Sequence, residues 1–259
     1  MASNGPDAFD SVARPVVTRA SVYAASYELA THQHRRGQLL YASQGTVAVT
    51  TPLGAWIAPP ERAVWIPPTM PHSVRMIGVV TTSSAYLEPA VTAMLGDACR
   101  VLAVSPLLRA LLVEAQHVPR EYDPAGRDGL LMGLLIAEIG RAATVPLALP
   151  LPKHAALARR CARFLERPTV TEDIDTWADD LAMHRRSFTR LFRRETGMSF
   201  AQWRQQACLL HALPRLSAGE PVTDIAMDLG YENPTGFSTM FRRALGRAPS
   251  TYRDAVPRA

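Results

Sequence analysis

Three histidines in the first third of the chain have the clearest capacity for chemistry. His32 and His34 are two positions apart, and His72 follows a proline-rich turn. Alternate residues of a β-strand point to the same side, so His32 and His34 can direct both imidazoles at one site. Three imidazoles could hold zinc, nickel, copper or iron. Gln38 both donates and accepts hydrogen bonds, so with the histidines it could equally bind an anionic or polar small molecule.

A second chemically capable set consists of arginines in two related segments of the last third of the chain. Residues 177–197 and 225–246 each contain a short apolar stretch, a break, and a second stretch with two phenylalanines and two adjacent arginines. Matched positions lie 48 residues apart in the first stretch and 49 apart in the second; the pairs are Ala178 with Ala226, Leu181 with Leu229, Phe188 with Phe237, Phe192 with Phe241, Gly197 with Gly246, and Trp203 with Tyr252. One residue inserted in the turn of the second copy explains the change of offset.

Each copy predicts two helices joined by a tight turn, with the phenylalanines facing inward and the arginines facing outward. Gly230 suits the positive φ that such a turn requires. Asn233 is a favourable N-cap and Pro234 a favourable first helical residue, so the outward-facing helix of the second copy should begin at Thr235 or just before it. This pattern is typical of a helix-turn-helix.

Residues 183–197 and 222–252 resemble the paired helix-turn-helix domain of AraC/XylS-type transcription regulators, and the resemblance covers about the last 100 residues. It implies that the second helix of each copy enters a major groove of DNA and that a rigid connecting helix, here 200–216, holds the two about one duplex turn apart. Pro214 departs from an ideal connector and is expected to kink or end its last turn.

The resemblance also assigns roles to outward side chains. The expected DNA-contacting residues are Arg185, Arg186, Thr189, Arg190, Arg193, Arg194, Thr235, Ser238, Thr239, Arg242 and Arg243. Arginine at 186 and 190 can grip guanine with two parallel hydrogen bonds, worth about 1–3 kcal/mol of discrimination, whereas the second helix offers only short hydroxyl and methyl groups. We therefore predict that the first half-site is read more strictly. Arginines at 193, 194, 242 and 243 are expected to touch phosphates, which position without specifying sequence.

The distribution of charge agrees with a nucleic-acid partner for the second half. Residues 1–152 hold 11 basic and 11 acidic side chains, whereas residues 153–259 hold 17 basic and 12 acidic ones, so the whole net charge of +5 lies on the half with the repeat. A module that meets a polyanion in this way should bind with salt-sensitive affinity. For any single arginine, a solvated helix face remains the alternative.

The first half predicts an antiparallel barrel or sandwich of the jelly-roll kind. Short β-branched or aromatic runs are separated by glycines and prolines; they span 21–29, 38–43, 46–50, 55–58, 63–66, 72–76 and 79–87. The pattern His32-x-His34-x3-Gln38-x6-Gly45, with a later Pro-x2-Pro-His72, is similar to the two cupin motifs. This resemblance implies that the three histidines converge inside the barrel. Gln38 replaces the carboxylate of metal-binding cupins, which argues against an iron oxygenase.

Three interpretations of this pocket stay open. The histidines could be polar barrel residues without a ligand. They could form an effector pocket for a small organic molecule, made of His32, His34, Gln38, His72 and Trp65. They could also hold a divalent transition metal through His32, His34 and His72. Trp65 lies on a flanking strand, where aromatic residues are more often part of the core.

Two leucine-rich helices and a linker should follow the barrel. Ser105-Pro106 predicts a helix through Val118, and Asp123-Pro124 predicts another that ends before Arg141. The family resemblance implies a homodimer interface on such helices, with Leu131, Leu134 and Leu135 as candidates; packing against the barrel is the alternative. Residues 144–153 contain three prolines and no helical or strand pattern, so they predict a semi-rigid extended linker.

The expected fold class is α+β and multidomain. A cupin-like β-barrel with two helices at 1–143 forms the effector and dimerisation domain, 144–153 is the linker, and 154–259 is an all-α DNA-binding domain with two helix-turn-helix motifs joined by a helix. Cys99, Cys161 and Cys208 are odd in number and far apart, which favours reduced, buried thiols. Without a signal-peptide pattern or a long apolar run, a soluble cytoplasmic protein is expected.

Together these features predict a sequence-specific transcription regulator, an activator rather than an enzyme. Its expected partners are double-stranded promoter DNA, RNA polymerase, and a small-molecule or metal effector in the barrel. A cupin-type metalloenzyme fused to a DNA-binding domain is an alternative, against which Gln38 argues. A purely architectural DNA binder is a third interpretation, and it leaves the barrel histidines unexplained.

Overall fold

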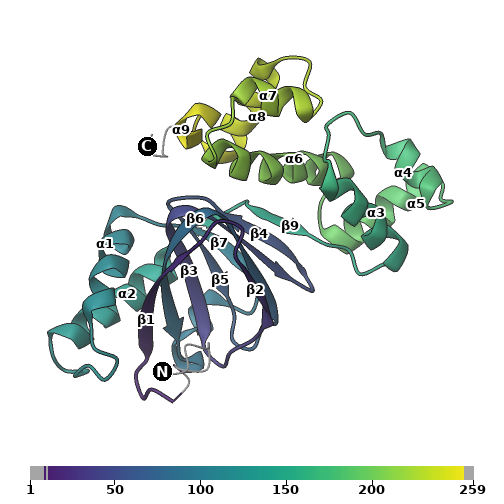
Figure 1. Ribbon diagram of the computed structural model, residues 1–259. Helices are drawn as coiled ribbons and strands as arrows, with labels where there is room; N and C mark the ends of the chain where they lie inside the picture. Colours follow the sequence, from purple (N-terminus) through teal and green to yellow (C-terminus); the bar gives the residue numbers. More distant parts are fainter. Residues whose placement is uncertain (1–8, 10, 254–259) are drawn as a thin grey trace. The chain divides into compact units, whose positions relative to one another are not determined.

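A computed structural model of the chain describes residue 9 and residues 11–253 (Figure 1). The described residues divide into two compact units. The first contains the residues up to Thr51 together with Trp56–Pro146, and the second contains Pro52–Ala55 and the residues from Leu147 onward. The expected α+β multidomain class, with a β-sheet domain carrying helices followed by a helical domain, is confirmed.

The first unit is built on a curled antiparallel sheet. Its strands are β1 (Val16–Tyr23), β2 (Glu28–His32), β3 (Gly37–Thr51), β4 (Gly54–Ala58), β5 (Arg62–Ile66), β6 (His72–Leu87), β7 (Arg100–Ala103) and β8 (Thr144–Val145). Neighbouring strands follow the order β1-β6-β3-β5-β7-β8, while β2 pairs with β6 and β4 with β3. The strands curl around one another, as the purple and blue ribbons of Figure 1 show.

The central ribbon of this sheet differs from the sequence expectation. Two pairs of short strands were expected at 38–50 and 72–87, but β3 and β6 are each continuous and pair along nearly their whole length. The register shifts around Gln44, where Gly45 has a φ of 74° and Gly78, on the facing strand, has a φ of 75°. These glycines therefore mark bulges at which the ribbon bends, and the chain does not leave the sheet there.

Other strand expectations were also imprecise. The run 21–29 is divided between β1 and β2 by a turn in which Ser26 has a φ of 62°. β7 was not expected. Residues 144–153 were expected to lack strands, but β8 pairs with β7, and β9 (Ala148–Pro150) lies in the second unit. β-Branched Val145 opposite Val101 explains the first of these pairings.

Two helices cover one face of the sheet. Helix α1 (Pro106–Glu114) starts as expected, because the Ser105 side chain accepts a hydrogen bond from the Leu108 amide; it ends at Glu114, where a 3-10 turn follows. Helix α2 (Arg127–Arg141) begins later than expected. The Asp123 carboxylate accepts from the Ala125 amide and so stabilises a preceding turn rather than the helix start.

The leucines of α2 mostly pack against the chain's own barrel. Leu135 is fully buried in a core shared with Leu39, Trp65 and Leu112, and Leu131 packs partly buried against the same core. The expectation that Leu135 lies in a dimer interface is therefore wrong. Leu134 is 45% exposed and remains a candidate.

The second unit is entirely helical after β9. Its helices are α3 (Ala155–Glu166), α4 (Ile174–Asp180), α5 (Arg185–Thr196), α6 (Phe200–Ser217), α7 (Val222–Asp228), α8 (Pro234–Leu245) and α9 (Pro249–Arg253). Helices α4 and α7 have equal length and lie 48 residues apart, whereas α5 and α8 have equal length and lie 49 apart. The predicted duplication and its single insertion are confirmed.

Each copy has the same local construction. Gly197 and Gly246 end α5 and α8 in the left-handed conformation, with φ of 71° and 75°. Asn233 caps α8 by accepting from the Gly236 amide, and Pro234 is its first residue, as predicted. The phenylalanines four apart are buried in both copies. No helix among the described residues has the length and apolarity needed to cross a membrane.

Candidate DNA-binding surface and barrel site

Helix α5 separates an apolar face from a basic one. Phe188, Leu191 and Phe192 are buried. Phe188 and Phe192 pack around the Trp177 ring of α4 with ring centroids 6.5 and 6.3 Å away. The opposite face carries the residues that the sequence assigned to DNA, and all of them are exposed: Arg185, Arg186, Thr189, Arg190, Arg193 and Arg194. They line one open hollow together with His184, the N-cap of the helix.

The arginines of α5 differ in their partners. Arg185 pairs with Asp175 at 2.7 Å, and Arg194 pairs with its neighbour Glu195 at 3.3 Å. Within the described part of the chain, Arg186, Arg190 and Arg193 make no ion pair. Three guanidinium groups therefore lie on the solvent face of this helix without a carboxylate that neutralises them.

The remaining α5 candidate, Thr189, is already engaged. Its hydroxyl donates to the Arg185 carbonyl oxygen at 2.9 Å, one turn back in the same helix. The methyl group is the part of this side chain left to meet a base edge, and a thymine methyl is a suitable partner.

Helix α8 presents a shorter and less basic surface. Thr235 and Thr239 are exposed and Ser238 is half-buried. Arg242 and Arg243 are exposed near the end of the helix, and neither makes an ion pair with any described residue. The positions assigned to DNA in the two copies thus occupy the same face of equivalent helices.

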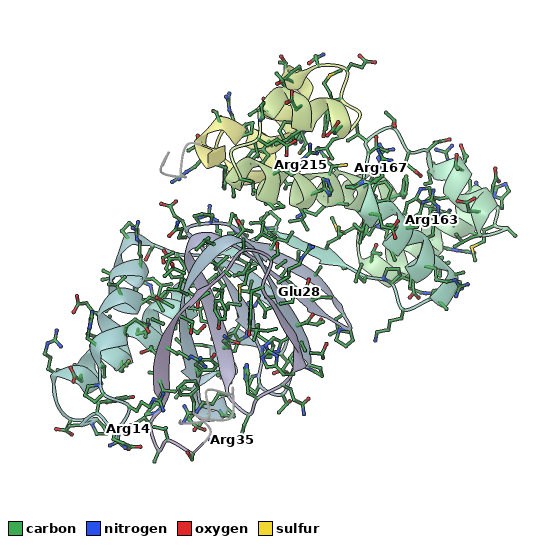
Figure 2. All side chains as sticks on the ribbon, viewed as in Figure 1. Arg14, Glu28, Arg35, Arg163, Arg167 and Arg215 are labelled. Atoms are coloured by element: carbon green, nitrogen blue, oxygen red, sulfur yellow. The ribbon has the colours of Figure 1, made fainter. Side chains whose placement is uncertain are left out.

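The connector α6 is continuous through Pro214 and ends only at Ser217. The expectation that Pro214 could end it is therefore wrong. A capping box of Ser199 and Gln202 fixes its start. Near its other end, Arg215 (Figure 2) pairs with Glu220 and with Asp228, at 2.6 Å for the latter, which ties the connector to α7.

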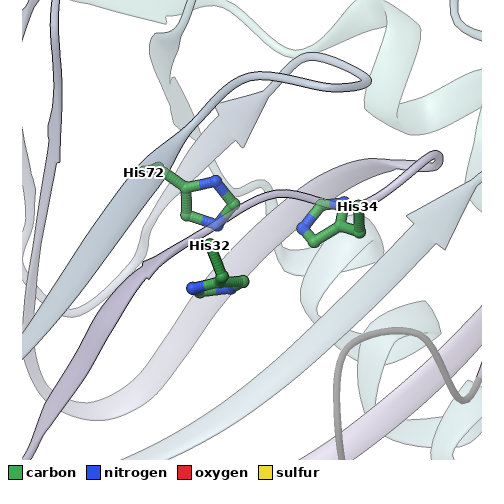
Figure 3. A group of neighbouring side chains, drawn as sticks. All are labelled: His32, His34 and His72. Carbon is green, nitrogen blue, oxygen red and sulfur yellow. The ribbon is translucent and has the colours of Figure 1, made fainter.

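The three histidines of the first unit meet, as the cupin resemblance implied (Figure 3). One ring nitrogen of each of His32, His34 and His72 lies within 4.8 Å of the others. The ring centroid of His72 is 4.4 Å from that of His32 and 5.1 Å from that of His34. His34 and His72 are buried and His32 is half-buried. This cluster could hold a metal ion.

Backbone carbonyls set the tautomer of each ring. Nδ1 of His32 contacts the Ala30 oxygen and Nδ1 of His72 contacts the Met70 oxygen, both at 2.8 Å, while Nδ1 of His34 faces the Arg36 oxygen. A carbonyl oxygen only accepts, so Nδ1 carries the hydrogen and the Nε2 atoms of neutral rings carry lone pairs. This is the arrangement by which proteins orient histidines that ligate metals.

The Nε2 atom of His72 is buried, and it has no hydrogen-bond partner among the described residues. Burial lowers the pKa of His72 to about 4, so the ring is neutral at neutral pH. A buried acceptor without a partner costs about 1–3 kcal/mol, which a bound metal or a ligand donor would recover.

Gln38 is linked to the cluster through His34. The position of its Oε1 lies 3.1 Å from His34 Nε2, and its Nε2 position lies 3.1 Å from the Ser84 hydroxyl and 3.2 Å from the Tyr86 hydroxyl. The amide nitrogen donates to the two hydroxyls, and the amide oxygen faces the His34 ring. A metal on His34 would bind at the Nε2 atom that Gln38 now contacts.

A cavity of about 300 Å³ lies inside the barrel next to these residues. Its wall contains His32 and Gln38. Alternate residues of β1 and β6 also line it, including Arg19, Ser84 and Tyr86. These positions could not be predicted from the sequence, because β1 begins at Val16 rather than at the expected Ser21 and no local pattern shows which face of each strand is internal.

Trp65 was expected at this pocket, and the structure contradicts that expectation. Trp65 pairs across the strands with Leu39, whereas Gln38 is the next residue along β3. Successive residues point to opposite faces of a sheet. Trp65 is therefore fully buried in the core beneath α1 and α2, where its Nε1 donates to the Gly96 oxygen at 3.3 Å.

A buried arginine near the cavity was also not expected from the sequence. Arg36 is fully buried. Its guanidinium donates to the carbonyl oxygens of Phe9, Val12 and Arg14. Phe9 in turn stacks on Tyr86 at 4.8 Å, so Arg36 fastens the start of the described chain against the cavity wall.

The three cysteines are buried and free, which agrees with the sequence expectation. Burial raises the pKa of each thiol to about 12. The thiolate that reacts or binds metal is therefore scarce at neutral pH.

Known proteins share both halves of this arrangement. Residues 14–135 match the family described as AraC-like ligand binding domain, and residues 177–255 match the family described as Helix-turn-helix domain. The HTH-type transcriptional regulator NimR of Escherichia coli is 34% identical over 235 residues, which are 89% of this chain and 85% of NimR. Regulatory protein SoxS of Salmonella typhimurium is 41% identical over 68 residues, 26% of this chain and 64% of SoxS. A crystal structure of ToxT from Vibrio cholerae aligns with 95% of this chain at 11% identity and a TM-score of 0.40.

Proposed function

The chain belongs to the AraC family of helix-turn-helix transcription regulators, and from this premise we propose that it is an activator controlled by an effector bound in its barrel cavity. The observation that supports DNA reading most directly is the exposed face of α5, where Arg186, Arg190 and Arg193 make no ion pair with described residues. The relatives it matches are transcription regulators and not enzymes, so we do not propose a metalloenzyme.

In the proposed complex α5 and α8 enter successive major grooves. Arg186 and Arg190 read guanines, while Thr235 and Thr239 of α8 contact base edges through small groups. The first half-site is therefore read more strictly than the second. Arg185 contributes less than its neighbours, because it must first give up its bond to Asp175.

Control by the effector would follow from linkage. A ligand that prefers one arrangement of the barrel and DNA-binding units shifts the population toward that arrangement, and it can do so only by its difference in affinity for the two. We propose residues 1–143 as the sensing domain, 144–153 as the linker and 154–259 as the DNA-binding domain, with RNA polymerase as the partner of the activated form.

The experiment that tests DNA reading compares Arg190→Ala with wild type on selected and random duplexes. Selection from a random duplex library first defines the sites that the wild-type full chain prefers. Arg190→Ala should then lose discrimination at one base pair, by about 1–3 kcal/mol, and keep it elsewhere. Arg167→Ala, which removes an exposed arginine outside the two reading helices, is the matched control. Equal losses on selected and random DNA for Arg190→Ala would refute the assigned role.

A second proposal concerns the histidine cluster, which we infer to be a divalent transition-metal site. The observations that favour it are the buried Nε2 atom of His72 without a partner and the carbonyl-fixed tautomers of all three rings. His32, His34 and His72 would hold the ion, and a three-histidine set leaves coordination positions open for another ligand. Metal analysis of the purified protein tests this proposal.

A further inference from the structure

The barrel cavity combines one charged residue with a mixed wall. Among the described residues that line it, Arg19 is the only side chain with a permanent charge, and none is a carboxylate. Arg19 lies on β1 opposite Ser84 of β6, and the alternate residue Ser21 lies opposite Thr82. Because alternate residues share a face, this guanidinium and these hydroxyls belong to one side of the cavity wall.

The hydroxyl of Tyr86 belongs to the same polar side. Tyr86 is the next alternate residue after Ser84 on β6, so it points to the same side of the sheet, and both residues line the cavity with Arg19. Its hydroxyl oxygen accepts a hydrogen bond from the Gln38 amide nitrogen at 3.2 Å.

The rest of the wall is aromatic and aliphatic. Tyr23 and Tyr27 lie together with ring centroids 5.3 Å apart. Leu29, Val74 and Met76 add aliphatic surface. A cavity of about 300 Å³ is about ten times the roughly 30 Å³ that one water occupies in the liquid. It therefore suits a molecule of about ten heavy atoms with an apolar body.

We propose that the effector is a small organic acid, with its carboxylate at Arg19 and the Tyr86 hydroxyl and its apolar body against Tyr23 and Tyr27. This inference rests on the proposed function in that it names the class of effector for the same cavity. The cavity favours binding of an anion, because charge-assisted hydrogen bonds to a guanidinium are about twice as strong as hydrogen bonds between neutral groups. An organic cation is disfavoured, because none of the described residues that line the wall is a carboxylate.

The test uses acids and their uncharged amides as matched probes. Benzoate is compared with benzamide, and phenylacetate with phenylacetamide, by isothermal titration and ligand-detected NMR on the full chain. The protein is first dialysed against a chelator, so that a metal on the histidines supplies none of the positive charge. We expect at least one acid to bind wild type about tenfold more tightly than its amide.

Variants assign that preference to a residue. Arg19→Gln should abolish the tenfold preference, and Arg19→Lys, which keeps the charge, should retain most of it. Arg127→Gln removes an exposed arginine at the start of α2, outside the cavity, and should change nothing. The Lys variant also keeps the test valid if the Gln variant folds poorly.

Three results would overturn the inference. They are equal binding of acid and amide by wild type, no binding of either acid even at millimolar concentration, and an unchanged preference in Arg19→Gln. Sequence-specific DNA binding is measured on the same samples without acid. Its absence counts against the proposed regulator, whereas loss of the acid preference counts only against the anion site.

Discussion

At the scale of single residues, chemistry was easier to predict than orientation. The meeting of His32, His34 and His72 was expected because the resemblance to the two cupin motifs implies it. Trp65 was assigned to the wrong face, because one position along a strand inverts the direction of a side chain. Arg19 was missed for the same reason, since its place in the cavity depends on the β1–β6 register, which no local pattern encodes.

The metal proposal is tested at this scale. Protein purified without affinity-metal columns is stripped with chelator and titrated with Zn²⁺ and Ni²⁺. Wild type should bind one ion, and at 100-fold excess over its Kd the ion should stabilise the protein by about 2.7 kcal/mol, seen as a rise in Tm. His34→Ala and His32→Ala should each weaken binding by at least about tenfold, because losing a ligand should cost at least as much as losing a group that orients one.

The control for that experiment is His117→Ala, which removes an exposed histidine outside the cluster and should bind metal as wild type does. Two variants are used because His34 is buried and its loss could also disturb packing, whereas His32 is half-buried. The metal-site proposal would be contradicted if wild type bound no metal ion, or if both variants bound the ion as tightly as wild type does.

At the scale of elements, the helical repeat could be predicted almost completely, and the sheet could not. Helix ends are encoded locally, by Asn233, Pro234 and the two left-handed glycines, so the sequence defined both copies closely. The β3–β6 ribbon depends on pairing between distant segments. Gly45 and Gly78 carry the same turn signal whether the chain bends within a strand or leaves it, and the sequence alone could not distinguish the two.

The turn of the first copy contains a strained position that the second copy avoids. Ala182 has a φ of 52°, whereas the equivalent residue 48 positions on is Gly230, with a φ of 80°. A left-handed conformation costs an L-residue about 1–2 kcal/mol. Glycine avoids this cost, but it loses more conformational entropy on folding than alanine does, which offsets part of the gain. Ala182→Gly should therefore raise the free energy of unfolding of the second unit by about 0.5–1 kcal/mol.

Urea unfolding followed by helical circular dichroism measures this change. The matched control is Ala162→Gly at an exposed position inside α3, where the same substitution should lower the unfolding free energy by about 1 kcal/mol. If both variants are destabilised by similar amounts, the turn of the first copy is not strained.

At the scale of the whole molecule, the separation of charge was visible in composition alone. Five arginines proposed to meet DNA make no ion pair with any described residue, and all lie in the basic half: Arg186, Arg190, Arg193, Arg242 and Arg243. If each releases one counterion, the logarithm of the DNA association constant should fall with the logarithm of salt concentration with a slope of about −4 to −5. Fluorescence anisotropy over a salt series measures it.

One substitution distinguishes phosphate contacts from base contacts in the same assay. Arg243→Ala should weaken binding evenly across sequences and make the slope shallower by about 1. Arg127→Ala in the neutral half should leave the slope unchanged. A loss confined to selected sites would instead place Arg243 among the base readers.

The bend of the β3–β6 ribbon has a consequence for when the histidine cluster can exist. The His34 ring lies 5.1 Å from His72 and 5.5 Å from Tyr86, although these two residues stand at opposite ends of β6. Such contacts have high contact order and form only when the sheet has curled closed. A nascent or partly unfolded chain therefore has no assembled binding site, and whatever this site binds will favour completion of folding.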